Sequence, residues 1–344
     1  DCELNADTQY LTAGLIGCGY IGSMFNESSN LTDIYSHASA YSHHHDTRLV
    51  AVCDQSSERV NRCGARWNVE KRYTQFQQFL EDAPDLVSIC TPDETHFTIT
   101  REVITSGKVR GILCEKPLTT DLEEGRELVA LAASHGVTLI VNYSRRFHTG
   151  HQRSRDLISQ GDLGSIQAIN GVYTKGILHN GSHLIDLIRY LTDSEVCWVD
   201  TYKSNERPDG DISANVTLAL DTDTIVTLQA CHEDFYNIFE LDILGTRGRL
   251  SFRSLGHQIS VYWPEKSLRY PGYRELGKGQ IISRKMHNTT LNAVSNLVDC
   301  VNGKGKPVSS GTDAVMDLAV VSAIIKSAHE GTRIEVAAIK GDPE

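Results

Sequence analysis

Short apolar runs alternate with amphipathic segments over the first 143 residues of the chain. The apolar runs are rich in β-branched residues and predict buried strands, while the segments between them have the apolar spacing of one helix face. Such alternation is typical of βαβ units with a parallel sheet. The predicted strands lie within residues 11–22, 48–54, 85–92, 109–117 and 137–143, and the predicted helices within 56–67, 95–107 and 121–136.

The pattern changes after about residue 145. Longer runs of alternating apolar and polar residues, joined by tight turns, predict a mostly antiparallel sheet. Residues 26–36 and 264–285 are the most loop-like segments of the chain. The predicted strands of this part are 166–173, 195–204, 212–221, 224–233, 239–246, 247–254 and 257–263, and the predicted helices are 151–164, 182–192, 289–303 and 312–331.

These two patterns predict two domains, which a length of 344 residues accommodates. The first is an α/β domain with a parallel sheet over residues 1–143. The second is an α+β domain with an open, mostly antiparallel sheet over residues 144–344.

Charge and composition narrow the class of partner. The net charge of −11 disfavours nucleic acid and anionic membranes, although an anionic small molecule can still bind a local basic pocket. No apolar run is long enough to span a bilayer, and the N-terminus lacks the basic and apolar regions of a signal peptide. Nine cysteines without a CxxC pair favour a reducing, cytoplasmic location.

A glycine-rich turn follows the first predicted strand. The segment GCGYIG fits G-x-G-x-x-G, with Gly17, Gly19 and Gly22 around Tyr20 and Ile21. Glycines at these positions let the backbone approach a pyrophosphate, and the N-terminus of the next helix supplies N–H groups and a partial positive charge. The alternative is an ordinary tight turn. Because the motif joins a strand to a helix, it predicts a dinucleotide site.

Asp54 ends the second predicted strand. A carboxylate there accepts hydrogen bonds from both ribose hydroxyls and repels a 2′-phosphate, which predicts NAD rather than NADP unless an arginine reaches in from nearby. Asp54 follows the glycine turn at more than the usual spacing of about 20 residues. The excess is FNESSNLTDIYS, residues 25–36, an apparent insertion after the first helical turn. Three interpretations of this insertion are open: a loop decoration, a lid or a subunit contact.

Several motifs occur in an order that resembles the Gfo/Idh/MocA family, the relatives of glucose–fructose oxidoreductase and inositol dehydrogenase. They are GLIGCGYIG, AVCD, CTPDETH, CEKPL, NYSRRF, GSHLID, ELDILGTRGRL and KSAHEGTRIEV, and together they span almost the whole chain. The resemblance implies an NAD-binding Rossmann domain and a second domain whose C-terminal helix packs back on the first. It also implies a homodimer or homotetramer through the open sheet face.

The resemblance further implies which residues form the cofactor site. Pro117 holds the turn of Lys116, the implied active-site lysine, and Tyr143 and Arg146 belong to a loop that faces nicotinamide and substrate. The implied cofactor contacts are Gly17, Gly19, Tyr20, Ile21, Gly22, Asp54, Cys90, Thr91, Pro92, His96, Glu115, Lys116 and Asn142.

The segment GILHNGSHLID, residues 176–186, carries the rest of the predicted chemistry. Oxidation of an alcohol requires a proton acceptor, and histidine suits this role because its ordinary pKa is about 6.5. A lysine beside the same oxygen stabilises the developing alkoxide. The resemblance implies that His183 is the acid/base residue and Lys116 its partner.

His179 stands where many members of that family have an acidic residue. It is therefore interpreted as a substrate contact, a proton relay or only a first-turn helix residue. Together with Lys116 and His183 it completes the predicted catalytic set. The predicted substrate contacts are Lys116, Tyr143, Arg146, His179, Asn180, His183 and Asp186.

Two other clusters have competing interpretations. The spacing of His179 and His183 also fits a helical zinc clamp, but no third ligand is evident and the glutamate of H-E-x-x-H is missing, so no metal is predicted. The histidines of residues 43–45 are interpreted as a solvated loop. The basic stretch 145–155 is either a phosphate site or a solvated face paired with acids.

The predicted function is NAD-dependent hydride transfer at a secondary alcohol of a sugar, sugar phosphate, sugar nucleotide or cyclic polyol. One alternative is a glycosidase that uses tightly held NAD for transient oxidation, with no net formation of NADH. The other is a non-catalytic, dinucleotide-sensing regulatory protein, which would need neither Lys116 nor His183.

Overall fold

The computed structural model describes residues 10–26 and 33–336 of the chain. The chain divides into two compact units. The first comprises residues 1–147 and 287–314, and the second comprises residues 148–286 and 315–344. Within the described residues, no helix is long and apolar enough to cross a membrane.

The first unit is built on a six-stranded parallel sheet in the order β3-β2-β1-β4-β5-β6. Strand order reverses between β1 and β4, which is the arrangement of a dinucleotide-binding Rossmann fold. The strands are β1 Leu11–Ile16, β2 Thr47–Cys53, β3 Lys71–Tyr73, β4 Leu86–Ile89, β5 Gly111–Cys114 and β6 Thr138–Val141.

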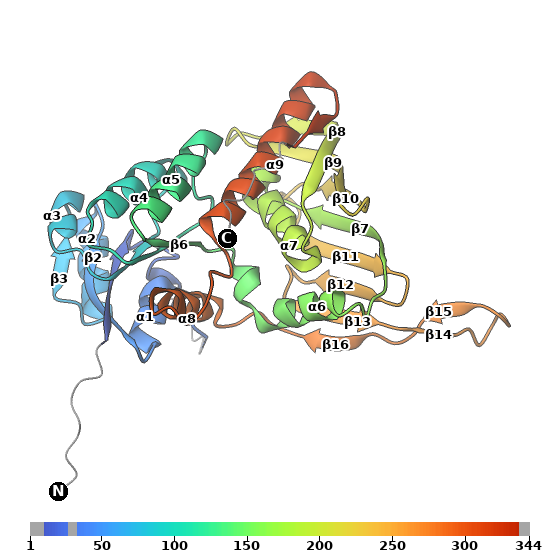
Figure 1. The fold of residues 1–344 in the computed structure, drawn as a ribbon, viewed down its shortest axis with the longest axis horizontal. Helices are drawn as coiled ribbons and strands as arrows, with labels where there is room; N and C mark the ends of the chain where they lie inside the picture. Colours follow the sequence, from blue (N-terminus) through green and yellow to red (C-terminus); the bar gives the residue numbers. More distant parts are fainter. Residues whose placement is uncertain (1–9, 27–32, 337–344) are drawn as a thin grey trace, which may run out of the picture. The chain divides into compact units, whose positions relative to one another are not determined.

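Helices cover both faces of this sheet, with α4 and α5 on one face and α1 and α8 on the other (Figure 1). Because both faces are covered, β4 and β5 are buried along their whole length and read as continuous apolar runs. The helices of the unit are α1 His37–His43, α2 Ser57–Arg66, α3 Phe76–Glu81, α4 His96–Thr105, α5 Leu122–Ser134 and α8 Thr289–Val301, with 3₁₀ turns at Met24–Asn26, Asp93–Thr95 and Ser144–Phe147.

The core of the first unit joins residues that are far apart in the sequence. Leu15, Leu86 and Leu113 from the sheet are fully buried together with Leu297 from α8. Burying each of these side chains contributes about 1.5–3 kcal/mol. Residues 287–314 therefore complete a core that the N-terminal part of the chain begins.

The second unit contains a nine-stranded sheet in the order β16-β13-β12-β11-β7-β10-β9-β8-β17. Only the β7–β10 pair is parallel, because β7 and β10 are separated by a helix and two other strands. The strands are β7 Ile166–Tyr173, β8 Val196–Glu206, β9 Ile212–Leu220, β10 Ile225–Ala230, β11 Phe239–Gly245, β12 Arg249–Arg253, β13 Gln258–Tyr262, β16 Gln280–Ser283 and β17 Ile334–Glu335.

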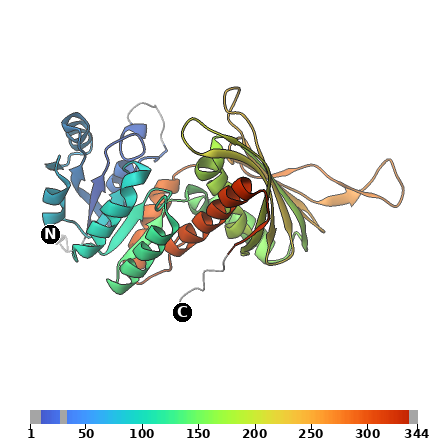
Figure 2. The same cartoon turned by 90° about the horizontal axis from the view of Figure 1, so that it is seen from above.

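Helices α6 Thr149–Ser159 and α7 Ser182–Thr192 lie against one face of this sheet (Figure 2). Helix α9 Gly311–Glu330 begins in the first unit and continues in the second. The buried Arg189 of α7 pairs with Asp317 of α9 at 2.6 Å and with Glu195 at 2.6 Å. This ion pair fixes the C-terminal half of α7.

The structure confirms the predicted fold class, a Rossmann domain followed by a domain with a mostly antiparallel sheet. Two helices and one strand of the first unit were missed. The edge strand β3 and helix α3 are short and lack a clear apolar period, and α1 begins directly after the insertion at 25–36, of which residues 27–32 lie outside the described part. In the second unit, the two-residue strand β17 was also missed.

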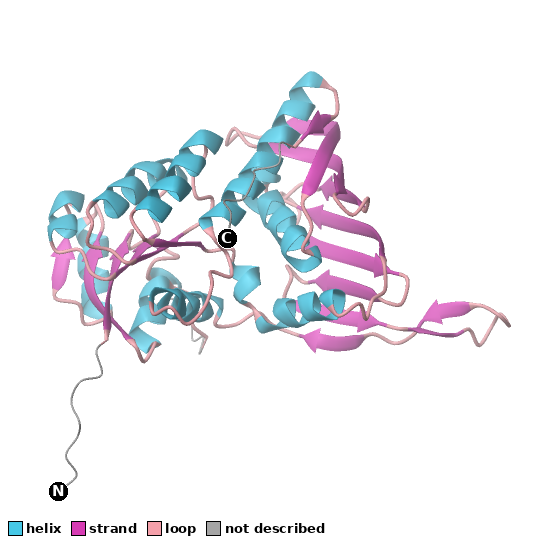
Figure 3. Ribbon diagram, in the orientation of Figure 1, coloured by secondary structure: helices cyan, strands magenta, loops and turns pink. Residues whose placement is uncertain are grey.

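The prediction of a loop over residues 264–285 is wrong. This segment forms a hairpin, β14 Pro264–Lys266 with β15 Arg274–Leu276, followed by β16, which joins the edge of the large sheet. The hairpin extends beyond the sheet (Figure 3), and its exposed strands have no core face to impose an alternating pattern.

Candidate active site

The predicted cofactor residues of the first unit gather at the carboxyl edge of the parallel sheet. The glycine turn follows β1, Asp54 follows β2, and Cys90 begins the turn after β4. Glu115 and Lys116 follow β5, and Asn142 follows β6. In open α/β sheets ligands bind at this edge, where the strand order reverses.

The three glycines of GCGYIG each meet a different steric demand. Gly17 has φ +93°, and a Cβ there would lie 2.4 Å from the Cys90 carbonyl oxygen. A Cβ on Gly22 would lie 2.0 Å from the Gly17 carbonyl oxygen, so glycine is required for the close packing of the turn. A Cβ on Gly19 would meet nothing within 4 Å. Gly19 therefore leaves open space at the position where a pyrophosphate approaches the backbone.

Asp54 is buried and binds the glycine turn directly. Its carboxylate accepts hydrogen bonds from the backbone N–H of Cys18 at 2.8 Å and of Ser56 at 2.8 Å. The guanidinium of Arg59 donates to it from Nε at 3.0 Å and from Nη2 at 2.8 Å. Burial would raise the pKa of Asp54, but Arg59 and the two backbone donors lower it overall, so the group is a carboxylate.

Arg59 alters the charge that Asp54 presents to the ribose end of the cofactor. A bare carboxylate repels a 2′-phosphate, whereas an ion pair with a half-exposed arginine carries no net charge. The prediction of NAD left room for an arginine near Asp54 but named no residue. The arginine lies five residues downstream, in the first turn of α2, as the i+5 position from Asp54 could have indicated.

We expect Asp54→Ala and Arg59→Ala to shift cofactor preference in opposite directions. Removing Asp54 takes away the ribose acceptor and releases the Arg59 guanidinium, so NAD affinity should fall by about tenfold more than NADP affinity. Removing Arg59 leaves an unpaired carboxylate, so NADP affinity should fall by about tenfold more than NAD affinity. Calorimetric titration of both dinucleotides measures this. If either variant weakened both dinucleotides equally, the assignment of this pair to cofactor choice would be wrong.

His96, a predicted cofactor contact, is fully buried. It hydrogen-bonds to two of the turns at the carboxyl edge of the sheet, those that contain Thr91 and Pro117. Its Nδ1 donates to the Pro117 carbonyl oxygen at 2.7 Å, and its Nε2 donates to the Thr91 carbonyl oxygen at 2.9 Å. Because a carbonyl can only accept, both ring nitrogens carry protons. Burial alone would lower the pKa of His96, but the Cys114 side chain and these carbonyls raise it to about 10. His96 thus holds the turn that follows Lys116.

The segment after β5 carries the predicted lysine. Glu115 and Lys116 are half-buried, and the Lys116–Pro117 peptide is cis. The Glu115 carboxylate accepts hydrogen bonds from His37 Nε2 at 2.8 Å and from Asn142 Nδ2 at 2.7 Å. Burial would raise the pKa of Glu115, but His37, Asn142 and the nearby Lys116 lower it. A carboxylate is therefore held one residue before the lysine ammonium group.

Tyr143 and Arg146 are both buried in the first unit. The guanidinium of Arg146 donates to the Val308 carbonyl oxygen at 3.1 Å and pairs with Asp313 at 3.1 Å. In the second unit, Arg155 pairs with Asp193 at 2.9 Å. Two arginines of the basic stretch 145–155 are thus paired with acids, which favours that interpretation over a phosphate site.

The histidine segment of the second unit begins with a π-helical turn, Gly176–Gly181, and α7 begins at Ser182. His179 therefore lies on a π turn and not in the first turn of the α-helix, whereas the predicted helix 182–192 is confirmed. His179 is exposed, Asn180 and His183 are half-buried, and Asp186 is buried. Single π turns in helices often occur at functional sites, because they redirect the side chains that follow.

A carboxylate from elsewhere in the sheet holds this π turn. Asp211, buried at the start of β9, accepts hydrogen bonds from the backbone N–H of Leu178 at 3.1 Å and of His179 at 3.4 Å. Gly176 has φ +75°, and a Cβ there would lie 2.0 Å from Asp211 Oδ2. Asp211 was not predicted because it lies more than 30 residues from the turn that it caps.

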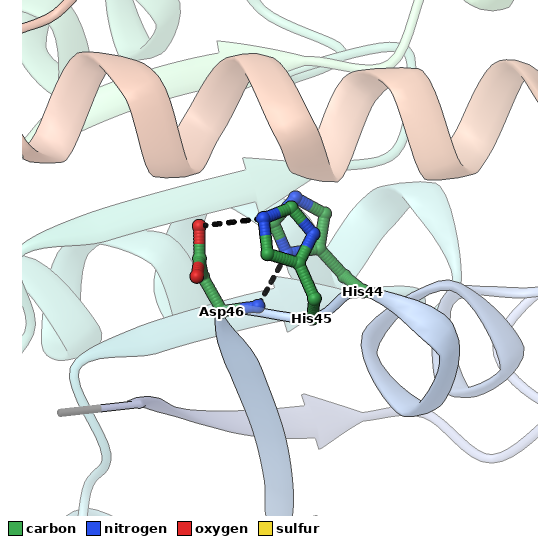
Figure 4. Close-up of side chains that lie close together, drawn as sticks. All are labelled: His44, His45 and Asp46. Atoms are coloured by element: carbon green, nitrogen blue, oxygen red, sulfur yellow. Dashed lines mark hydrogen bonds and ion pairs between the residues drawn. The ribbon is translucent and has the colours of Figure 1, made fainter. Parts of the chain in front are cut away.

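One group of potential metal ligands occurs among the described residues, His44, His45 and Asp46 (Figure 4). The rings stack at 4.9 Å, His45 pairs with Asp46 at 3.2 Å, and His44 Nδ1 accepts the Asp46 backbone N–H at 3.2 Å. The prediction of a solvated loop is wrong for His43, which ends α1, and for His44, which is buried. Burial together with His45 lowers the pKa of His44. These contacts are local turn contacts.

Two models of one protein family match almost the whole chain. Residues 11–143 match the model of an oxidoreductase family with an NAD-binding Rossmann fold, and residues 155–336 match the C-terminal alpha/beta domain of the same family. The chain belongs to the Gfo/Idh/MocA oxidoreductase family. This confirms the resemblance inferred from the motifs, the predicted class of enzyme and the prediction of NAD as cofactor.

Relatives in this family include sugar and polyol dehydrogenases. Myo-inositol 2-dehydrogenase of Thermotoga maritima is 22% identical, with 95% of this chain and 99% of the relative covered. The scyllo-inositol 2-dehydrogenase (NAD(+)) of Bacillus subtilis is 24% identical, with 84% and 89% covered. The solved structure of levoglucosan dehydrogenase in complex with NADH has a TM-score of 0.81 at 18% identity, with 96% and 100% covered, and shows the shared fold.

The residues at the sheet edge fit the cofactor of the family. Gly19 leaves room for the pyrophosphate, Asp54 and Glu115 are carboxylates suited to ribose hydroxyls, and the buried Oδ1 of Asn142 has no hydrogen-bond partner within the protein. A buried acceptor without a partner is costly and is normally satisfied by a ligand or water.

Proposed function

We propose that the protein oxidises a secondary alcohol of a sugar, sugar derivative or cyclic polyol with NAD as hydride acceptor. The observation that carries the proposal is the set of cofactor and lysine residues at the carboxyl edge of the Rossmann sheet, with Lys116 next to the held carboxylate of Glu115. The names of the relatives, which include inositol and glucoside dehydrogenases, support a polyhydroxylated substrate.

Two residues carry the proton chemistry in this proposal. When bound, NAD supplies the hydride acceptor. Lys116 donates a hydrogen bond to the substrate oxygen and stabilises the negative charge that develops there. His183 accepts the hydroxyl proton, as a neutral imidazole does near pH 7.

The remaining predicted residues bind the substrate. His179 and Asn180 lie on the π turn that Asp211 holds, and we propose that they bind substrate hydroxyls. Because His179 replaces the acidic residue expected at this position, it supplies either a donor or an acceptor according to its tautomer. Asp186, buried one helical turn after His183, is proposed to orient that ring.

Assembly and location are part of the proposal. The sheet face without helices carries half-buried ion pairs, Asp242 with Arg249 at 2.7 Å and with Arg253 at 2.6 Å. We propose that this face forms a homodimer or homotetramer, which light scattering tests directly. No disulfide joins the eight cysteines in the described ranges, which supports a reducing, cytoplasmic location.

The test of this function is NADH formation across a panel of free sugars, cyclic polyols, phosphorylated sugars and nucleotide-linked sugars. Absorbance at the NADH band reports turnover, and Lys116→Ala serves as the matched inactive control. We expect turnover with at least one member of the free sugar or polyol groups. No turnover with any polyhydroxylated alcohol, despite intact NADH binding, would contradict the proposal.

A further inference from the structure

His37 is a fully buried histidine with polar partners on both sides of its ring. It is the first residue of α1, and it lies against β4 and the segment after β5. Its Nδ1 is 2.8 Å from Ser88 Oγ, and its Nε2 is 2.8 Å from Glu115 Oε1. Ser88 in turn lies 3.0 Å from the hydroxyl of the buried Tyr41.

The chemistry of these partners determines where a proton lies on the ring. Glu115 is a carboxylate and can only accept, so Nε2 of His37 carries a proton and donates it. Ser88 both donates and accepts, so it can match either state of Nδ1. His37 is therefore a fixed donor to Glu115 in either orientation of the Ser88 and Tyr41 hydroxyls.

Backbone hydrogen bonds to the glycine turn position His37. The carbonyls of Ile21 and Gly22, the last two residues of the motif, accept the backbone N–H groups of His37 and Ala38 at 3.2 and 2.9 Å. The first residue of α1 is thereby held directly against the end of the dinucleotide motif.

Glu115 in turn fixes the orientation of Asn142. The Asn142 amide donates from Nδ2 to Glu115 Oε1 at 2.7 Å, which leaves Oδ1 buried with no partner within the protein. Both donors reach Oε1 of Glu115, so Oε2 remains as an acceptor on a side chain that is 16% exposed. Two acceptors, Glu115 Oε2 and Asn142 Oδ1, thus suit a ligand that brings two hydroxyl donors.

We propose that His37 is a positioning residue for cofactor binding, which acts by holding Glu115 so that Glu115 and Asn142 together accept hydrogen bonds from the ribose hydroxyls of the dinucleotide. This inference rests on the proposed function only in taking a dinucleotide as the ligand. It assigns a role in cofactor binding to α1, the helix that follows the insertion.

The test compares NADH affinity of four variants by fluorescence titration, which requires no substrate. His37→Gln keeps a donor at the place of Nε2, and His37→Asn keeps one at the place of Nδ1. We expect His37→Ala and His37→Asn to weaken NADH binding at least about tenfold, because a charge-assisted hydrogen bond is lost, and His37→Gln to restore most of the affinity. Ser88→Ala, which keeps the donor to Glu115, should have a smaller effect.

A double-mutant cycle with Glu115→Gln separates positioning from general damage. If His37 acts through Glu115, His37→Ala should weaken binding much less in the Glu115→Gln background than in the wild type. Equal affinity of the glutamine and asparagine variants, or fully additive effects in the cycle, would overturn the proposal. Failure to find a sugar substrate while NADH binding follows this pattern would count against the proposed function only.

Discussion

Replacing Lys116 by alanine is expected to lower kcat at least about a thousandfold while NADH affinity stays within about twofold. The large effect follows from the charge that develops on the substrate oxygen, since a single preorganised donor at such a position contributes about 10²–10³ in rate and a full positive charge contributes more. Although the resemblance implies that Lys116 also contacts the cofactor, NADH affinity should be largely preserved because the contacts on Glu115, Asn142, Asp54 and the glycine turn remain.

Two controls make this result specific. Lys326→Ala removes an exposed lysine of α9 and should leave kcat unchanged. Lys116→Arg keeps the positive charge but not the geometry of the ammonium group, and it should recover only part of the rate. Loss of NADH binding in Lys116→Ala would place the lysine in cofactor binding and contradict its assigned role. Normal turnover would remove it from the mechanism.

Replacing His183 by asparagine is expected to lower kcat by roughly 10²–10⁴-fold, the range for loss of a general base. Asparagine keeps the size and polarity of the side chain but cannot take up a proton near neutral pH. In the oxidation direction, the activity of the wild type should rise with pH as the histidine becomes neutral, because only the neutral ring accepts a proton. The corresponding step in the pH profile should be absent in His183→Asn.

His179→Asn is the matched control on the same π turn. If His179 binds substrate hydroxyls, this change should raise KM with a smaller effect on kcat, because asparagine still donates and accepts hydrogen bonds. An unchanged pH profile in His183→Asn would contradict the assignment of the general base. A loss of the profile in His179→Asn instead would move the proton transfer to that residue.

The parallel sheet and its cofactor edge were predictable because their causes are local in sequence. A strand buried on both faces requires a continuous apolar run, and the glycine turn requires glycine at fixed positions. Each of these demands is visible in a few neighbouring residues. The steric contacts of Gly17 and Gly22 show why other residues are excluded there.

The residues that hold the site were not predictable in the same way. His37 reaches Glu115 across 78 residues of sequence, and Asp211 reaches the π turn across more than 30. Such contacts depend on how strands and helices pack, and no local spacing encodes them. Arg59 is different, because it lies only five residues after Asp54, in the first turn of α2, so this contact is local in sequence.

The segment that precedes α7 was also not predictable from apolar spacing. The apolar spacing of residues 182–192 correctly predicted α7, but the preceding residues form wider turns. Three features accompany these wider turns: the left-handed backbone of Lys175, the positive φ of Gly176 and the hydrogen bonds to the buried carboxylate of Asp211. The spacing of apolar residues shows none of them.

The most direct measurement is the stoichiometry of NADH formed per alcohol oxidised, with excess NAD and the most active sugar or polyol of the panel. We expect one NADH for each molecule of ketone product, formed at least about a thousandfold more slowly with Lys116→Ala. Consumption of substrate without accumulation of NADH would contradict net oxidation of the alcohol by NAD. It would indicate transient oxidation by a retained cofactor. NADH binding with no turnover of any substrate would indicate a dinucleotide-sensing protein instead.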